Sequence, residues 1–504
     1  MDEKRQKSWD EPASGQEGGG EASEYQPGGT ESDTARSTTP SPDERLMEEI
    51  LEGENLKAAY EVVVRNAGAP GVDGITVDGL KSYLAAHWQR IRREILSETY
   101  APQAVRRVEI PKGGGGVRKL GIPCVIDRFI QQATLQVLQR RWDKTFSENS
   151  YGFRPGRSQH QAVKQAQKYV QDGFQYVVDI DLEKFFDKVN HDVLMSRIAN
   201  RVKDKRLLKL IRSYLNAGVM ENGLTRATEE GMPQGSPISP LLSNLLLDEL
   251  DRELQRRNLH FVRFADDCNI YVKSERAGQR VMDSITRFLA KKLRLKVNKE
   301  KSAVGKPSAR KFLGFRFLKE TDPRICVAPP AIEKAKEKIR KLTRSGKGKS
   351  LTRTIEKLAA YLRGWIAYFG LSEAMHDFAR LDKWIRRRLR CLVWKHWKHG
   401  RNRLRHLRQL DINEVRATKL AGSSKGAWRL SASPALCYAL PNSFFTQQGL
   451  PSLLQITQAR ISSRRTAVYG PVRTVVSQGK RATAYLCKFA FGGQSRGALP
   501  HPVR

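Results

Sequence analysis

The chain has 504 residues, of which 39% are hydrophobic, so it can form several packed domains. Its formal net charge of +37, with a pI near 10.1, indicates a polyanionic partner whose binding depends steeply on salt. An anionic membrane surface is the competing partner, but the sequence has no long apolar stretch or amphipathic anchor. The six cysteines form no Cys-x-x-Cys pair, which argues against a disulfide framework and favours a reducing compartment.

The two ends of the chain differ in composition from the middle. Residues 1–45 are rich in Gly, Ser, Thr, Pro and Glu and poor in large apolar residues, so we expect a disordered acidic leader. This leader is too acidic for an organellar transit peptide and lacks the apolar core of a secretory signal. Residues 456–504 form a basic tail in which Ala484–Phe491 is the one candidate strand, and we assign this tail no role.

The first motif of the middle region is a predicted hairpin. Residues 104–111 and 117–123 have the composition of two strands, and a tip of four glycines, Gly113 to Gly116, joins them. Lys112 and Arg118 flank this tip. Glycines alone would make only a permissive turn, so the two cations are the informative part of the motif.

A second motif places carboxylates at the end of a strand. Residues 176–180 are mostly apolar and β-branched, which predicts a buried strand ending at Asp181. The segment that follows has the composition of a turn and a helix start, with Asn190 or Asp192 as the expected cap. Asp179 and Asp181 lie on the same face of the strand, so spacing alone does not choose between them.

A third motif is an Asp-Asp pair in a predicted β-hairpin. Two short apolar runs within His260–Val272 flank Asp266 and Asp267, so both carboxylates fall at the turn. Adjacent carboxylates repel each other and stay ionised only beside a strong positive charge, for which bound Mg²⁺ is a good candidate. The alternative is an ordinary turn, in which Asp is common. Upstream of this hairpin, the loop Gly231–Pro240 opens a helix predicted over residues 241–254.

The C-terminal half is helical and basic by its pattern. Residues 361–369 carry aromatic residues that we expect in a helix core. A second helix is predicted from Asp382 to Arg403, where apolar residues recur at helical spacing and the remainder is strongly cationic. We predict that Arg386, Arg387 and Arg390 on this helix bind RNA phosphates.

These motifs together resemble the reverse transcriptases encoded by group II introns. The polymerase-palm part of the resemblance rests on Asp181 with the aromatic pair after it, on a Pro-Gln-Gly core and on Ala-Asp-Asp. Other segments are typical of the group II intron enzymes in particular. The matching segments are Gly68–Ile75, Ser150–Ser158, Asp181–Asp187, Pro233–Gly235, Ala265–Asp267, Leu295–Lys301, Phe312–Phe315, Tyr361–Phe369 and Lys425–Arg429.

The resemblance implies an α+β fold of the right-hand polymerase type, with fingers, a palm with an antiparallel sheet, and an α-helical thumb called domain X. We expect the N-terminal extension and fingers over residues 46–160 and the palm over 161–325. The thumb, with a short ending like that of the bacterial class C members, is expected over 326–455. The leader, 1–45, and the basic tail, 456–504, lie outside these domains.

The resemblance also implies the site. It selects Asp181 over Asp179, so that Asp181, Asp266 and Asp267 would bind two Mg²⁺ ions and catalyse nucleotide transfer. The residues implied to bind the nucleotide are Lys112, Arg118, Leu182, Phe186 and Gln234. Phe186 would exclude ribonucleotides by occupying the space of the 2′-hydroxyl, although an ordinary core Phe would fit the same pattern.

The implied function is that of an RNA-directed DNA polymerase that also binds its intron RNA to assist splicing and retrohoming. Its expected partners are group II intron RNA, an RNA template with a DNA primer, target DNA and deoxynucleoside triphosphates, without a membrane, in a cytoplasmic, nucleoid-associated ribonucleoprotein. Alternatives are a domesticated reverse transcriptase in phage defence or CRISPR adaptation, and a maturase acting only as an RNA-folding protein. The absence of paired Cys ligands argues against the zinc-dependent HNH-type endonuclease domain that many of these proteins append.

Overall fold

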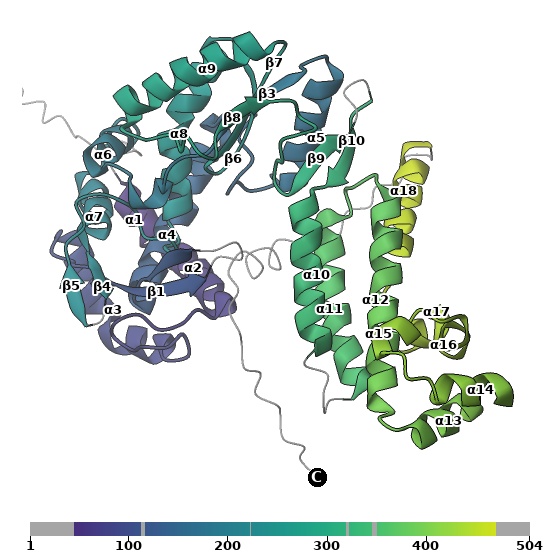
Figure 1. Ribbon diagram of the computed structural model, residues 1–504. Helices are drawn as coiled ribbons and strands as arrows, with labels where there is room; N and C mark the ends of the chain where they lie inside the picture. Colours follow the sequence, from purple (N-terminus) through teal and green to yellow (C-terminus); the bar gives the residue numbers. More distant parts are fainter. Residues whose placement is uncertain (1–44, 112–115, 222, 319–321, 345–349, 470–504) are drawn as a thin grey trace, which may run out of the picture. The chain divides into compact units, whose positions relative to one another are not determined.

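The computed structural model describes residues 45–111, 116–221, 223–318, 322–344 and 350–469 (Figure 1). Contacts group the chain from Pro42 onward into one unit, to which all described residues belong. The predicted leader, Lys112, glycines 113–115 of the hairpin tip and the candidate strand at 484–491 lie outside the described residues. Helices and mainly antiparallel sheets make an α+β fold, as the sequence predicts.

The N-terminal part contains the predicted glycine-tipped hairpin. Its strands pair in the order β2-β1-β4-β5, antiparallel within the β1–β2 and β4–β5 hairpins and parallel between β1 and β4. The hairpin prediction is therefore confirmed. The elements are α1 (Leu46–Ile50), α2 (Gly53–Asn66), α3 (Leu80–Leu96), β1 (Val105–Pro111), β2 (Val117–Ile122), α4 (Val125–Trp142), α5 (Gln159–Gln171), α6 (His191–Ala199), α7 (Lys205–Asn216), β4 (Val219–Glu221) and β5 (Leu224–Arg226).

The palm is built on a four-stranded antiparallel sheet in the order β6-β7-β3-β8. Its strand β3 ends at Ile180, as predicted, and Asn190 caps the next helix by accepting a hydrogen bond from Val193 N. The elements are β3 (Tyr176–Ile180), α8 (Ser239–Arg256), β6 (His260–Phe264), β7 (Asp267–Val272), α9 (Glu275–Phe288) and β8 (Ala303–Gly305).

Side chains that alternate along the palm strands divide the sheet between two hydrophobic clusters. Val178 and Ile270 belong to the large cluster that includes helices α8 and α9. Their neighbours Val177 and Tyr271 belong to a second cluster with α5 and the β9–β10 hairpin. Because consecutive residues of a strand point to opposite faces, this sheet is covered on both sides. Its strand ends and turns are therefore where functional side chains can reach solvent.

The C-terminal part is helical and has its own core of buried Leu, Ile, Trp and Phe residues. Within the described residues, no helix is both long enough and apolar enough to span a bilayer. The elements are β9 (Phe315–Leu318), β10 (Arg324–Val327), α10 (Pro329–Arg344), α11 (Leu351–Phe369), α12 (Met375–His396), α13 (Gly400–Gln409), α14 (Glu414–Ala421), α15 (Ala427–Leu430), α16 (Pro434–Ala439), α17 (Asn442–Gln447) and α18 (Leu453–Tyr469).

A close backbone approach connects the β9–β10 hairpin to α11. Gly314 has φ +79°, and a Cβ there would lie 3.1 Å from the ring of Phe369, so this position needs glycine. The hydroxyl of Tyr368 donates a hydrogen bond to the carbonyl of Leu313, at 3.0 Å. The aromatic residues of the predicted domain X segment therefore contact this hairpin as well as the helix core.

Three predicted boundaries and one predicted helix differ from the structure. The boundary at 160 falls inside α5, the one at 325 inside β10, and the one at 455 inside α18. The basic helix predicted from Asp382 to Arg403 is two helices, because α12 ends at His396 and α13 begins at Gly400. Lys398 between them has φ +50°, which interrupts the helical conformation.

Candidate active site

The Asp266–Asp267 pair lies at the β6–β7 turn, as predicted. Phe264 pairs with Asp267, so Ala265 and Asp266 are the two residues between the strands. Ala265 has φ +60°, a left-handed conformation of the kind that tight hairpin turns require. Asp266 therefore occupies the turn itself, and Asp267 begins β7 with its side chain exposed.

Asp181 lies next to this turn because β3 pairs with β7. In the register of the two strands, Ile180 is opposite Cys268, so the next position along each strand brings Asp181 beside Asp267. The backbone N–H of Asp181 donates a hydrogen bond to Ser302 Oγ, at 2.9 Å. The sheet thus brings Asp181 next to an Asp-Asp pair that lies more than 80 residues later in the sequence.

The electrostatics of the site show crowded negative charge. Desolvation and the charges of Asp266, Asp179 and Asp181 raise the pKa of Asp267 to about 7. Desolvation and Asp181 likewise raise the pKa of Asp266. Lys301 Nζ is 3.3 Å from Asp181 Oδ2, within ion-pair distance but without hydrogen-bond geometry.

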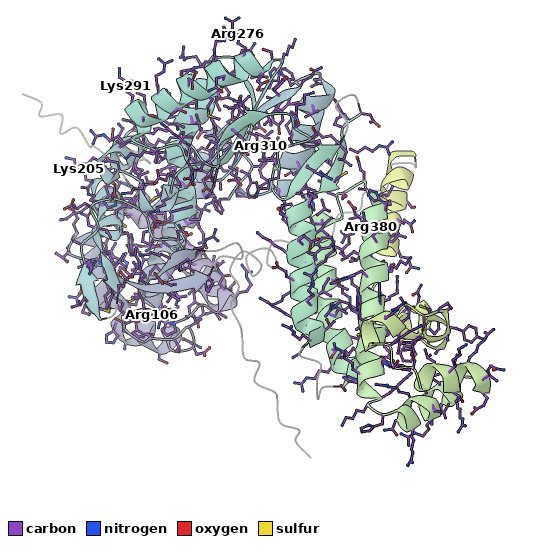
Figure 2. The ribbon with its side chains drawn as sticks, in the orientation of Figure 1. Arg106, Lys205, Arg276, Lys291, Arg310 and Arg380 are labelled. Carbon is purple, nitrogen blue, oxygen red and sulfur yellow. The ribbon has the colours of Figure 1, made fainter. Side chains whose placement is uncertain are left out.

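Asp179, the alternative to Asp181 as a metal ligand on β3, forms an ion pair with Arg310. Arg310, which is labelled in Figure 2, donates from Nη2 to Asp179 Oδ2 at 2.6 Å, and the same guanidinium donates to the carbonyl of Lys301 at 2.7 Å. Burial raises the pKa of Asp179, and the Arg310 charge opposes that rise. Asp179 is therefore a partly buried partner of Arg310, whereas Asp181 keeps a carboxylate oxygen without a hydrogen bond among the described residues.

The carboxylate group suits a hard divalent cation in its chemistry. In the part of the chain that is described, no three His, Cys, Asp or Glu side chains meet closely enough to form a complete metal site as they stand. The available donors are nevertheless all oxygens, and one buried oxygen of Asp181 accepts no hydrogen bond. Desolvation and neighbouring carboxylates both raise the pKa values of Asp266 and Asp267, and a bound cation would offset both effects by favouring the ionised carboxylates.

Two family models match the chain. Residues 110–317 match the model described as reverse transcriptase (RNA-dependent DNA polymerase), and residues 332–410 match the maturase-specific domain of group II introns. Protein YkfC of Escherichia coli strain K12 is 33% identical over 320 residues, which are 55% of this chain and 84% of YkfC. The chain belongs to the group II intron-encoded reverse transcriptase and maturase family.

Other relatives of this reverse transcriptase are matched over less of their length. Group II intron-encoded protein LtrA of Lactococcus lactis subsp. cremoris is 34% identical over 220 residues, which are 44% of this chain and 36% of LtrA. The chain thus matches most of YkfC but about a third of LtrA. A solved Cas6-RT-Cas1–Cas2 complex overlays 49% of this chain and 42% of that one at 23% identity, with a TM-score of 0.32, which is too low to support an argument.

The fingers hairpin brings one predicted nucleotide-binding cation to the carboxylates of the reverse transcriptase. Arg118 is exposed on β2, and its charge opposes the rise in the pKa of Asp266. Lys112 lies outside the described residues. The side chain of Leu182 is buried in the main core, so a contact of this residue with a nucleotide would come from its backbone.

The backbone carbonyls of Phe186 and Gln234 both accept hydrogen bonds from other segments of the site. Met232 N donates to the carbonyl of Phe186 at 2.6 Å, which joins the predicted gate to the Pro-Gln-Gly loop. Gly121 N of β2 donates to the carbonyl of Gln234 at 2.9 Å, which joins that loop to the fingers hairpin. The Phe186 ring is half-buried and packs against Phe185, so it is not an ordinary fully buried core residue.

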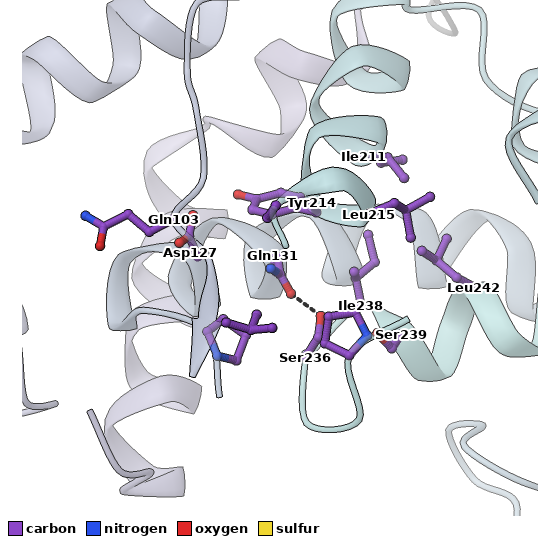
Figure 3. Close-up of a pocket in the computed structure, with 14 residues that line it drawn as sticks. Gln103, Asp127, Gln131, Ile211, Tyr214, Leu215, Ser236, Ile238, Ser239 and Leu242 are labelled. Atoms are coloured by element: carbon purple, nitrogen blue, oxygen red, sulfur yellow. Dashed lines mark hydrogen bonds between the residues drawn. The ribbon is translucent and has the colours of Figure 1, made fainter. Parts of the chain in front are cut away.

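A pocket lies behind the Pro-Gln-Gly loop (Figure 3). On one side Ser236 donates a hydrogen bond to Gln131 of α4. On another, Tyr100 donates to Asp127 Oδ1 at 2.7 Å, and burial raises the pKa of Asp127 to about 7. In the described part of the chain, Asp127 Oδ2 and the Tyr214 hydroxyl have no hydrogen-bond partner. Most of the side chains that line the pocket are apolar, and these polar groups join them behind the loop that carries Gln234.

The three arginines predicted to bind RNA are not equivalent. Arg390 is buried, and its guanidinium donates to the Leu440 carbonyl at 2.9 Å and to Asn442 Oδ1 at 3.2 Å. We therefore correct its assignment, because these contacts make it a structural residue. Arg387 lies 4.1 Å from the centre of the Trp428 ring, and this ring is itself 41% exposed. Arg386 and Arg387 are half-exposed and stay candidates for phosphate contacts.

Two arginines near the site were missed in the sequence analysis. Arg310 pairs with Asp179, and Arg263 is fully buried beneath the Asp-Asp turn. Arg263 had a recognisable pattern, because a charged residue inside the apolar run of a covered strand must have a buried partner. Arg310 had none, since it lies in a loop among other basic residues and only the fold brings it to β3.

Proposed function

We propose that this reverse transcriptase copies group II intron RNA into DNA at Asp181, Asp266 and Asp267, and that it binds the same RNA to assist splicing and retrohoming. The observation that carries the proposal is the convergence of these three carboxylates at the β3 and β7 strand ends, with the pKa of Asp267 raised to about 7. Carboxylates that lie this close together favour the binding of cations, and bound cations in turn can bind phosphates.

The carboxylates would hold two Mg²⁺ ions. When bound, such ions activate the primer 3′-hydroxyl as a nucleophile and neutralise charge on the leaving pyrophosphate. The donor set supports this proposal through its exclusively oxygen ligands and the oxygen of Asp181 that accepts no hydrogen bond among the described residues. Lys301, whose side chain is 67% exposed, can move away from Asp181 at little cost.

The other residues of the site would bind and orient the deoxynucleoside triphosphate. Arg118, exposed on the fingers hairpin, would contact its phosphates, since cations stabilise the negative charge that develops in phosphoryl transfer. Phe186 would lie beneath the sugar and exclude a 2′-hydroxyl. Gln234, on a loop bonded to both the fingers and the Phe186 segment, would contact the base or sugar.

Binding of intron RNA, of target DNA and of the primer–template is supported by charge. The net charge of +37 indicates an extended polyanionic partner, and the maturase-domain match covers α11 and α12. Arg386 and Arg387 are the half-exposed arginines of α12 that we propose for phosphate contacts. The three carboxylates favour this function over a maturase acting only as an RNA-folding protein.

The test of the active site is primer extension on poly(rA)·oligo(dT) with full-length protein. Asp181→Asn and Asp266→Asn should lower the extension rate by more than about a thousandfold, since metal ligands contribute several kcal/mol to transition-state stabilisation. Affinity for a group II intron RNA and the melting temperature should stay near wild type. Asp179→Asn is the matched control and should lose much less activity. Near-normal extension by either variant would refute the metal assignment.

The test of intron binding is a gel shift with group II intron RNA across a salt series. A specific maturase should bind this RNA more tightly than a structured RNA of equal length at every salt concentration, and should accelerate its splicing. Equal affinity for both RNAs and no effect on splicing would instead favour a domesticated reverse transcriptase that uses other templates.

A further inference from the structure

The buried guanidinium of Arg263 lies near the end of β6, beneath the Asp266–Asp267 turn. Its side chain is fully buried, and so is that of its ion-pair partner Asp251 on α8. Arg263 Nε donates to Asp251 Oδ1 at 2.7 Å and Nη2 donates to Oδ2 at 2.6 Å, which is the bidentate arrangement. Burial raises the pKa of Asp251 while Arg263 opposes the rise, and the two short hydrogen bonds favour the ionised pair.

All five donors of this guanidinium are used. Besides the two bonds to Asp251, Nη1 donates to the Ala265 carbonyl at 2.9 Å and to Asn244 Oδ1 at 3.0 Å, and Nη2 donates to Ser150 Oγ at 2.8 Å. An arginine has five N–H donors in a rigid planar fork, so no other side chain could replace this set of contacts. One of the five bonds ends on the turn residue that precedes Asp266.

The same residues hold a loop against the turn. Asn244 Nδ2 donates to the Gly152 carbonyl at 2.8 Å, and Tyr151 N donates to the carbonyl of Arg263 at 2.8 Å. A Cβ on Gly152 would lie 2.1 Å from the backbone nitrogen of Ala265, so this loop touches the turn without a side chain between them. The Ser150–Ser158 motif, to which the proposed function gives no role, therefore supports the catalytic turn.

We propose that Arg263 is a positioning residue for the metal-binding carboxylates. By bonding the Ala265 carbonyl, it would hold that residue in its left-handed conformation and so set where Asp266 and Asp267 lie relative to Asp181. The proposal rests on the proposed function, because it takes these carboxylates to bind the ions. A buried ion pair that served only the core would instead affect folding stability without affecting metal affinity.

The experiment measures Mn²⁺ binding to the full-length protein without turnover. Electron paramagnetic resonance reports free Mn²⁺ in the presence of a dideoxy-terminated primer–template and the next deoxynucleotide. Arg263→Lys keeps the charge but cannot make the five bonds, and we expect its Mn²⁺ affinity to fall about tenfold or more, as for residues that orient metal ligands. Ser150→Ala removes one of the five bonds, and we expect a loss of about twofold to threefold.

The matched control is a buried carboxylate in an ion pair that makes no bond to the turn. Asp204 pairs with Arg206 at 2.9 Å and accepts a hydrogen bond from Met47 N at 3.0 Å. Asp204→Asn should lower the melting temperature and leave Mn²⁺ affinity at the wild-type value. Asp266→Asn is the reference for the metal site and should lose Mn²⁺ binding.

The outcomes separate this proposal from the function on which it rests. Wild-type Mn²⁺ affinity in Arg263→Lys, with binding lost in Asp266→Asn, would overturn the positioning role and leave the proposed function standing. Normal binding in Asp266→Asn would overturn both. If Arg263→Lys does not fold, Ser150→Ala and Asn244→Ala decide the matter, and unchanged affinity in both would overturn the proposal.

Discussion

The palm and the helical region that follows it both bury charged side chains, but they use them for different purposes. In the palm, the Arg263–Asp251 pair is fully buried beneath a turn whose carboxylates stay within reach of solvent. In the helical region, Arg390 and Asp382 are buried in contacts with the segment from Leu440 to Leu454. Buried charge supports a reaction site in the first case and joins helices in the second.

This difference teaches that charge density in a sequence does not measure charge available to a ligand. Helix α12 carries many cations, yet Arg390 is buried, Arg388 donates to Thr343, and Arg387 lies over Trp428. Arginine readily stacks on tryptophan rings and donates hydrogen bonds to carbonyl groups because its planar cation is weakly hydrated. The RNA-binding capacity of such a helix is therefore smaller than its count of cations.

Removing the end of the chain should have the largest effect on the helical region. A chain that ends at Gln455 loses most of α18, including Arg460, whose Nη1 donates to the Ile366 carbonyl at 2.9 Å. Ser452 and Leu453, which donate to Asp382, stay in this shortened chain, but the rest of the helix no longer holds them in place. The region should lose about 3–5 kcal/mol of stability because the helix packing is lost and the hydrogen bonds to a buried carboxylate weaken. Thermal unfolding would measure this loss.

The control is a chain that ends at Tyr469, where α18 ends. This shortened chain should have the melting temperature of the full chain and should extend primers at the same rate. If the chain ending at Gln455 also melted normally, the predicted boundary at that residue would be right and the packing of α18 would be unimportant for stability.

Separate substitutions of Arg390 and of the Arg386–Arg387 pair should divide structure from RNA binding. Arg390→Gln should destabilise the helical region by about 2–3 kcal/mol and leave the salt dependence of RNA binding unchanged, because its charge is satisfied internally. Arg386→Gln with Arg387→Gln should reduce the slope of log affinity against log salt by about 1–2 units. A shallower slope for Arg390→Gln would show that our correction of its role is wrong.

Phe186→Ala should relax sugar selection in the palm. Truncating the ring removes the proposed steric clash with a 2′-hydroxyl, so the preference for deoxynucleotides over ribonucleotides should fall about 10–100-fold. Single-turnover incorporation of both nucleotide types measures the ratio. Phe185→Leu, at the fully buried neighbour, is the control and should change stability more than selectivity. An unchanged ratio in an active Phe186→Ala enzyme would make the ring a packing residue.

The smallest expected effect concerns Asp127 and pH. Its pKa of about 7 exceeds the ordinary value of 3.8, so the folded state binds this proton more tightly than the unfolded state does. The contribution of Asp127 to the free energy of unfolding therefore falls as pH rises from about 4 to about 7, and it stays constant above that range.

Asp127→Asn removes the destabilisation that comes from ionising this carboxylate, and the amide oxygen can still accept the hydrogen bond from Tyr100. The shift sets an upper limit of about 4 kcal/mol, and local hydration should reduce the gain to about 1 kcal/mol at pH 8, a rise of about 2–4 °C in melting temperature. At pH 5 the variant and the wild type should melt together. A difference that is equal at both pH values would mean that Asp127 does not titrate in this range.

Much of the palm could be predicted because its motifs are local. The strand before Asp181, the cap at Asn190 and the turn at Asp266 each follow from a few consecutive residues. The choice between Asp181 and Asp179 depended on the resemblance. Arg310, which pairs with Asp179, lies 131 residues away, so the sequence near β3 does not reveal this pair. Periodicity likewise could not reveal the break at Lys398, because the cations continue through it.

Asp382 also has a consequence for how the protein is made. Its carboxylate accepts hydrogen bonds from Ser452 Oγ and from Leu453 N, which is synthesised 71 residues later. While the ribosome adds those residues, α12 carries a carboxylate whose partners do not yet exist. The contacts that bury the Asp382 carboxylate can form only after Leu453 has left the ribosome, so α12 cannot complete its packing before α18 has been synthesised. Until then, the surface of α12 that α18 covers lacks its partner in the nascent chain.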